Sequence, residues 1–200
     1  MLARTPWPVA SRLESERLTL TPLSVDHAAP MVSVLADDAL YRFTGGEPPT
    51  LEQLRNRYAA QVVGGTQDGT QRWLNWIVNR RDAAVPVGFV QATVHLGTVL
   101  PGTVLPGTVL PNAGLPAPDG VVADLAWLIG SANQGQGLAS EATRRMMRFL
   151  RGQGITGFAA FIHPDHVASQ TVARHQHLHP TAHVHDGEVR WESGREQTRK

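Results

Sequence analysis

Hydrophobic periodicity predicts a strand and two helices at the start of the chain. Polar and apolar residues alternate over Glu16–Leu23, as in a half-buried strand, and Asp26 can cap a helix that ends at Leu35. Thr50 and Gln53 form the capping-box pattern of a second helix. The apolar residues of this helix, which recur every three or four positions, are Leu51, Leu54, Tyr58 and Val62.

The rest of the chain mixes further strand patterns with two helix patterns. The predicted strands are Gln71–Asn79, Val85–Leu96, Asp124–Ile129, Gly157–His163, Ala182–His185 and Glu188–Glu192. Helices are predicted over Leu138–Phe149 and His166–His175, and the Asp-Gly pair at 186–187 is typical of a tight hairpin turn. Mixed α and β order with antiparallel ends predicts an α+β fold.

Two loops interrupt this pattern. Residues 41–49 carry glycine, proline and aromatic side chains, and they form either a wall of a substrate pocket or a plain connector. Gly-Thr-Val-Leu-Pro occurs three times in tandem from Gly97 to Pro111, and proline at every fifth position prevents long ladders or helices. We therefore expect residues 97–119 to be an inserted, extended or partly disordered hairpin tip without a task of its own; a flap over a cleft or a dimer contact is the alternative.

Length and composition predict one enzyme-sized domain. The chain has 200 residues, and we expect a single domain over 13–193 with flexible termini at 1–12 and 194–200. A net charge of +1 provides no field for binding nucleic acid or an anionic membrane, so a small molecule or a protein terminus is the expected partner. The absence of cysteine excludes disulfides and thiolate nucleophiles. Because neither a signal peptide nor an apolar run of about 18 residues occurs, we expect a cytoplasmic protein.

The segment Asn133–Ala142 places a glycine loop between a predicted strand and a predicted helix. Glycine lets backbone N–H groups approach an anion, and the helix N-terminus favours negative charge, so a diphosphate is the expected ligand. The Lys and Ser or Thr of a Walker loop are missing, and so are the three glycines of a Rossmann fingerprint. An ordinary glycine-bearing turn is the alternative.

Two motifs resemble the GNAT acetyltransferases. The order Gln134-x-x-Gly137-x-Ala139 is similar to their acetyl-CoA loop, most of all in the branch of the ribosomal-protein-alanine N-acetyltransferases. The stretch His163–Ala173, with Pro164, Asp165 and Ser169 before a helix, resembles a second family motif at the right distance. The resemblance implies a GNAT-like, mostly antiparallel mixed sheet that is flanked by helices and splayed at its centre, between Ala123–Ile129 and Gly157–His163.

This resemblance also implies a direct, acetyl-CoA-dependent acetyl transfer to a primary amine, without a metal or a covalent enzyme intermediate. The backbone of Leu128, Ile129 and Gly130 would pair with the pantetheine arm, while the glycine loop would hold the pyrophosphate. The full set of implied cofactor-binding residues is Leu128, Ile129, Gly130, Gln134, Gly135, Gln136, Gly137, Leu138, Ala139, Ser140, His166 and Ser169.

Asp124 is the candidate catalytic residue. It is the only acid on the predicted strand 123–129, where members of the branch often have Glu. If it faces the cleft, it could take a proton from the ammonium group through water. The alternative is a structural salt bridge.

The sequence departs from the family pattern at three places. His166 replaces the usual Asn and can supply one donor but not the donor and acceptor pair of an amide. Gln176 and His177 replace Leu-Gly, so we expect a strained, looser end of the last helix. Ala173 stands where many members have the tyrosine that protonates the thiolate, although alanine is usual in this branch.

Several alternatives stay open. The acceptor is a protein N-terminus or a small amine, and a homodimer is compatible with the sequence. A catalytically weakened acyl-CoA-binding or sensory module is the second hypothesis, and a nucleotide-binding protein that uses the same loop is the third. Seven histidines occur between His163 and His185, but acidic ligands at fixed spacing are missing and we expect no metal.

Overall fold

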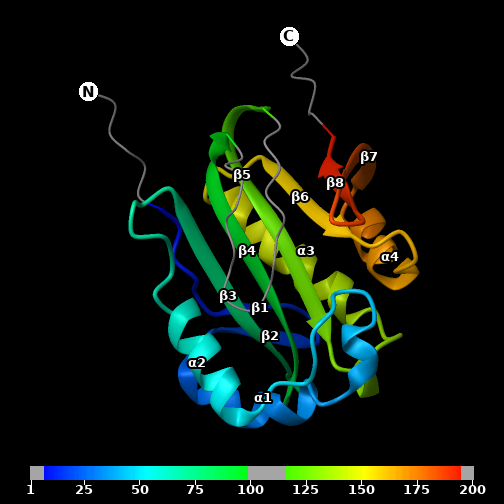
Figure 1. Cartoon of the computed structure of the whole chain (residues 1–200). Helices are drawn as coiled ribbons and strands as arrows, with labels where there is room; N and C mark the ends of the chain where they lie inside the picture. The colour runs from blue at the N-terminus through cyan, green and yellow to red at the C-terminus, as the bar shows by residue number, and fades with distance from the viewer. Residues whose placement is uncertain (1–6, 99–115, 195–200) are drawn as a thin grey trace.

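The computed structural model describes residues 7–98 and 116–194, in which eight strands form one sheet in the order β1-β2-β3-β4-β5-β6-β8-β7 (Figure 1). The strands are β1 (Leu13–Glu14), β2 (Leu18–Pro22), β3 (Gln71–Arg80), β4 (Pro86–Thr98), β5 (Pro116–Ile129), β6 (Gly157–Ile162), β7 (Leu178–His185) and β8 (Glu188–Ser193). The helices are α1 (Ala28–Val34), α2 (Leu51–Gln61), α3 (Leu138–Gly152) and α4 (Val167–His175), with 3₁₀ turns at Val25–His27, Asp38–Tyr41 and Ser131–Asn133. None of the described helices is long and apolar enough to cross a bilayer.

The sheet parts at its centre. Described neighbours in the sheet are antiparallel except β5 and β6, which are parallel and pair only from Val122 opposite Gly157 to Asp124 opposite Ala159. Beyond Asp124 the two strands diverge, so the edge of β5 that faces β6 has no partner strand over Leu125–Ile129 among the residues that the structure describes. The α+β class, the mostly antiparallel sheet and the central splay predicted from the sequence are confirmed.

Helices cover both faces of the sheet and create two cores. Alternate residues of β4 and β5 pack with α3, which lies behind the sheet in Figure 1. On the opposite face, α1 and α2 bury a smaller cluster against Ile77, Phe89 and Leu128. Near Phe89 and Leu128, β4 and β5 are therefore covered on both faces, and their sequences there are almost continuously apolar.

Local predictions were correct in type and wrong in some boundaries. The Thr50–Gln53 capping box is present at α2. Asp26 does not cap α1: the Ser24 N–H donates to Nδ1 of His27, residues 25–27 form a 3₁₀ turn, and α1 begins after His27. The short Ser24–His27 contact satisfies the start of the turn, leaving Asp26 inside it.

The predicted hairpin tip is extended at both of its described ends. β4 continues to Thr98 and β5 begins at Pro116, so residues 97–98 and 116–119 are strand. Residues 99–115 of the insertion, and residues 1–6 and 195–200 of the predicted flexible termini, lie outside the described part. Residues 7–12 contact the core: Trp7 and Ala10 pack against it, and the carbonyl of Ser11 accepts a hydrogen bond from Trp76 Nε1 at 2.8 Å.

The end of α4 carries the backbone strain predicted for His177. This residue has φ 60°, in the left-handed region, and its N–H donates to the carbonyl of Arg174 at 2.9 Å as in a glycine-terminated helix. Gln176, by contrast, is buried, and its Nε2 donates to the carbonyl of Ser140 at 3.1 Å. This contact ties the end of α4 to α3 and gives the buried amide of Gln176 a partner; a looser helix end than in relatives stays a prediction.

We predict that His177→Gly stabilises the protein, because glycine adopts positive φ without the steric penalty of a Cβ atom. The free energy of unfolding should rise by roughly 0.5–1 kcal/mol. Chemical denaturation measures this change. The control is His179→Gly in the exposed part of β7, where glycine should lower stability; a stability loss in both variants would contradict the role assigned to His177.

Candidate active site

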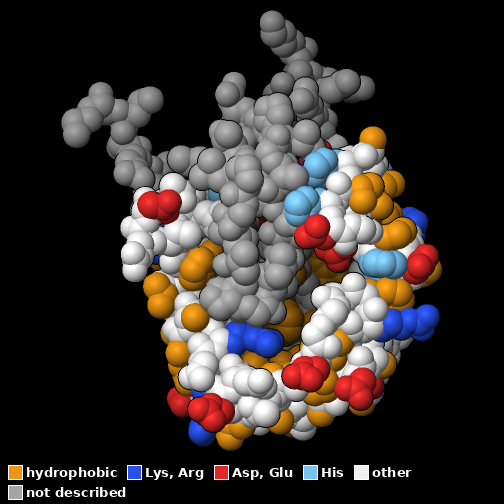
Figure 2. Space-filling view, viewed as in Figure 1, with side chains coloured by type: hydrophobic (Ala, Val, Ile, Leu, Met, Phe, Trp, Pro, Cys, Tyr) orange, Lys and Arg blue, Asp and Glu red, His pale blue; other side chains and the backbone are white. Residues whose placement is uncertain are grey.

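A cavity of about 1450 Å³ opens where β5 and β6 part (Figure 2). It continues from the glycine loop and the start of α4 to the segment between α1 and α2. Tyr41, Phe43 and Glu47 line it, which confirms that residues 41–49 wall a pocket. Figure 2 shows a hollow with an apolar floor and with histidine and acidic side chains on the side of β7 and β8.

Gly88 sets the close approach of β4 and β5 beside this cavity. A Cβ atom at this position would lie 2.0 Å from the carbonyl oxygen of Leu128, a distance that no side chain permits. Glycine is therefore required for β4 to pair with β5 up to Ile129. The apolar-Gly-apolar pattern of this strand reflects that contact.

The glycine loop leads directly into α3, as the sequence predicted. Gly137 is the N-cap residue of α3 with φ 75°, a conformation that L side chains rarely adopt. Gly135, Gly137, Leu138, Ala139 and Ser140 line the cavity at this helix N-terminus. Backbone N–H groups and the helix dipole make this a suitable site for a diphosphate.

Two of the predicted loop residues position the loop. The side chain of Gln134 lines the cavity and donates from Nε2 to the carbonyl of Ile129 at 2.8 Å, so it braces the loop against β5. Gln136 lies on the other side of the loop, where its carbonyl accepts from Arg17 Nη1 and its Oε1 accepts from Arg80.

Glu141 anchors the first turn of α3 to the start of the sheet. Its carboxylate accepts hydrogen bonds from the Ser15 hydroxyl, the Arg17 N–H and Arg17 Nε, the last at 2.7 Å. Burial by itself would raise the pKa of Glu141, but these hydrogen bonds hold it below its ordinary value. Glu141 was not among the residues predicted from the sequence; the one local signal for it is an acidic residue in the first turn of a helix.

Some of the β5 backbone groups that were predicted to bind the pantetheine arm already form hydrogen bonds within the protein. The N–H of Gly130 donates to the carbonyl of Val87 at 2.8 Å, and the carbonyl of Ile129 already accepts from Gln134. Antiparallel pairing alternates the direction of backbone groups. The N–H groups of Ile129 and Trp127 therefore point toward the splay, and Trp127 was not among the predicted residues.

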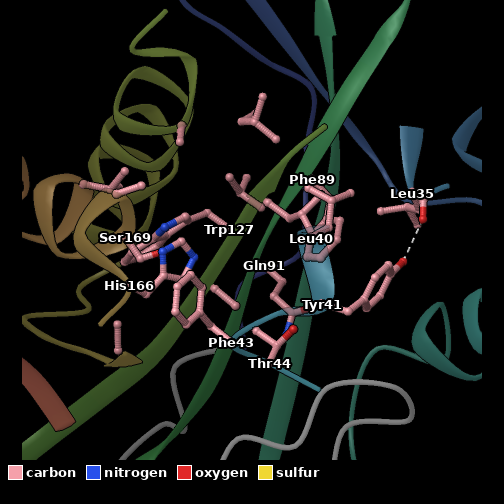
Figure 3. A pocket seen from close by; sticks show the side chains of 18 of the residues that line it. Leu35, Leu40, Tyr41, Phe43, Thr44, Phe89, Gln91, Trp127, His166 and Ser169 are labelled. Carbon is pink, nitrogen blue, oxygen red and sulfur yellow. Dashed lines mark hydrogen bonds between the residues drawn. The ribbon is translucent and has the colours of Figure 1, made fainter. Parts of the chain in front are cut away.

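His166 and Ser169 both line the cavity at the start of α4. The ring of His166 stacks on Phe43, with 4.6 Å between ring centroids and 23° between planes, and Phe43 also contacts His163 at 5.4 Å (Figure 3). Burial, followed by the charge of His163, lowers the pKa of His166, which favours a neutral ring. This contact joins the pocket wall at 41–49 to α4 across the cavity.

Ser140 is oriented by α4. Its hydroxyl lies 3.1 Å from Nδ1 of His175, and its carbonyl accepts from Gln176. The two contacts hold the first turn of α3, which carries the predicted pyrophosphate site, against the far side of the splay.

Asp124 lies at the point where β5 and β6 separate, but it is not among the cavity-lining residues. Its buried carboxylate is 3.1 Å from His95 Nε2 and 3.7 Å from Nη1 of the buried Arg190. Arg190 belongs to β8, and its Nε also pairs with Glu192. The ion pair therefore links β5 to β8 across β6, where the small Ala159 lies opposite Asp124.

The face of the cavity near α2 carries polar atoms without partners. Tyr58 Oη and Gln91 Nε2 are buried and have no hydrogen bond within the described part of the chain, and both residues line the cavity. Burial raises the pKa of Tyr58 to about 12, so it is a neutral hydroxyl. Figure 3 shows the side chain of Gln91 extending from β4 toward Thr44. A bound molecule can satisfy both groups.

The histidines of the last hairpin are dispersed. His183 packs edge-on against Phe161, and His185 contacts Asp186 at 3.4 Å. No group of three or more His, Asp or Glu side chains that could hold a metal ion occurs among the residues described here.

Comparisons with known proteins agree with this geometry. The chain resembles a GNAT-family acetyltransferase from Bacillus anthracis (TM-score 0.65, 13% identity, 91% of this chain and 96% of that chain). It also resembles RimL, a ribosomal L7/L12 alpha-N-protein acetyltransferase in complex with coenzyme A (0.64, 17%, 91% and 97%), and AAC(6')-Ib in complex with paromomycin and acetyl-CoA (0.65, 16%, 92% and 99%). No curated protein sequence matches the chain. The sequence model of the Acetyltransferase (GNAT) domain matches residues 17–179, and the chain therefore belongs to the GNAT acetyltransferase family.

Proposed function

We propose that the protein transfers the acetyl group of acetyl-CoA directly to a primary amine. The observation that carries this proposal is the juxtaposition of the glycine loop at the N-terminus of α3 with the unpaired edge of β5, both on one cavity. A diphosphate suits the loop, and an amide-bearing chain suits a free strand edge. Coenzyme A contains both groups, in this order.

The proposed cofactor contacts follow the cavity wall. N–H groups from Gly135 to Ala139 bind the pyrophosphate, and the Ser140 hydroxyl adds a donor. The pantetheine arm pairs with β5 near Ile129 and passes His166 and Ser169 at the start of α4. The thioester then lies deep in the splay, near Trp127, where the acceptor amine can attack it.

The acceptor is a protein N-terminus or a small amine. RimL is described as a protein acetyltransferase and AAC(6')-Ib was solved with an aminoglycoside, and this chain is equally similar in fold to both. A cytoplasmic location and a homodimer stay predictions. Thiol release with a panel of peptides and amines tests the reaction, and tight acetyl-CoA binding without any turnover would instead favour a binding or sensory module.

We predict that Gly137→Ala weakens acetyl-CoA binding. A Cβ atom at φ 75° costs about 1–2 kcal/mol, and relief of that strain turns the loop N–H groups away from the ligand. The dissociation constant from isothermal titration should rise about tenfold or more, which corresponds to about 1.4 kcal/mol.

The matched control is Gly152→Ala at the other end of α3, where an added Cβ would meet no described atom within 4 Å beyond its own stretch of helix. Its affinity should equal that of the wild type. Equal affinities for all three proteins would contradict the loop assignment, and displacement of CoA by ATP would favour a nucleotide-binding protein.

Asp124→Asn tests the predicted catalytic residue. We expect the free energy of unfolding to fall by as much as about 3 kcal/mol, because a buried Arg190 loses one of its two carboxylates. The pH profile of kcat tests the catalytic role. If the fall of kcat at low pH disappears in the variant, Asp124 acts as a base. If that fall is unchanged, the role of Asp124 is limited to the structural ion pair.

A further inference from the structure

Glu188 is placed at the open end of the splay. β8 pairs antiparallel with β6, with Val189 opposite Ile162 and Arg190 opposite Phe161, so Glu188 lies beside His163 just past the end of β6. Glu188 lines the cavity on the same side as His163, whose ring contacts Phe43. In the described residues its carboxylate has no hydrogen bond and no ion pair.

Resting on the proposed function, we propose that the Glu188 carboxylate binds the ammonium group of the acceptor and takes its proton, directly or through one water. Four acids line the cavity among the described residues: Glu47, Asp165, Asp186 and Glu188. The first three are exposed, and Asp186 contacts His185. Glu188 is the one that is partly buried and unpaired.

Electrostatics suit this role. Burial raises the pKa of Glu188, and the neighbouring Asp186 raises it further, while His163 and His185 act in the opposite direction. A raised pKa makes the carboxylate a stronger base, and it is ionised only above that pKa. The rate should therefore fall as the pH decreases through this value. An ammonium group would also give the partly buried carboxylate a positively charged partner, which it does not have among the described residues.

With Glu188 as the base, the protons and bonds of the acetyl transfer balance as follows. Glu188 takes one proton from R–NH₃⁺, and the freed lone pair of the amine attacks the thioester carbonyl carbon. The C–N bond forms and the C–S bond breaks, and the second proton of the nitrogen goes to the departing thiolate to give CoA-SH. Glu188 then releases its proton to solvent.

Independent polar groups point to a ligand in the same cavity. Tyr58 Oη and Gln91 Nε2 are both buried, lack partners in the described residues and line the cavity on the side of α2. They can bind the polar atoms next to the amine, such as the first carbonyl of a peptide. The acceptor thus has an ammonium group and a hydrogen-bonding group within one cavity.

The test compares wild type with Glu188→Gln, and Asp186→Asn is the matched control because it removes the adjacent, exposed acid. Isothermal titration uses the CoA-bound protein, which cannot turn over, and three amines: an amidated peptide with a free N-terminal alanine, spermidine and paromomycin. We expect about tenfold weaker binding of the preferred amine to Glu188→Gln and a much smaller loss for Asp186→Asn, whose carboxylate acts on Glu188 only through its charge. Melting temperatures verify folding, and Glu188→Asp, which retains a carboxylate, should recover part of the affinity.

Turnover provides the second readout. In Glu188→Gln, kcat/KM should fall about a hundredfold and follow the fraction of free amine up to the amine's own pKa, about 8 for a peptide terminus. Affinity and pH profile equal to those of a wild type that acetylates amines would overturn the role of Glu188 alone. If the wild type acetylates no amine, the proposed function fails, and the titrations of the CoA-bound protein still decide whether Glu188 binds ammonium.

Discussion

The separation of β5 from β6 after Asp124 is the constraint on which the site depends. A sheet interior normally satisfies the backbone groups on both edges of a strand, and unpaired groups are costly when water is excluded. Here the lack of a side chain at Gly88 lets β4 approach β5 closely, while the Asp124–Arg190 pair ties β5 to β8 at the point where the strands part. Within the described part of the chain, one edge of β5 is therefore unpaired, and the glycine loop places the N-terminus of α3 beside it.

The sequence predicted the features that short segments encode. Glycine positions, capping residues and apolar periodicity are local, and they were sufficient for the α+β class, the strand-loop-helix at Gly137 and the tight turn at 186–187. The match to the GNAT pattern then supplied the splay and the family. Boundaries were less accurate because they depend on tertiary partners, as at Ser24–His27 and at the extended ends of β4 and β5.

Contacts between distant segments could not be predicted in the same way. The stacking of Phe43 on His166 joins residues that no pattern relates, and the bond from Gln176 to Ser140 shows how a departure from the family pattern is accommodated. The alternation along β5 assigns Ile129 and Trp127, rather than Gly130, to the open edge. Glu188 was part of a predicted strand, but only the pairing of β8 with β6 brings it to the cavity.

The decisive measurement is the structure of the protein with coenzyme A bound. We expect the diphosphate within hydrogen-bonding distance of the N–H groups between Gly135 and Ala139, and the pantetheine arm along the edge of β5 that faces the splay. Coenzyme A bound elsewhere, with the space between β5 and β6 filled by side chains, would contradict it.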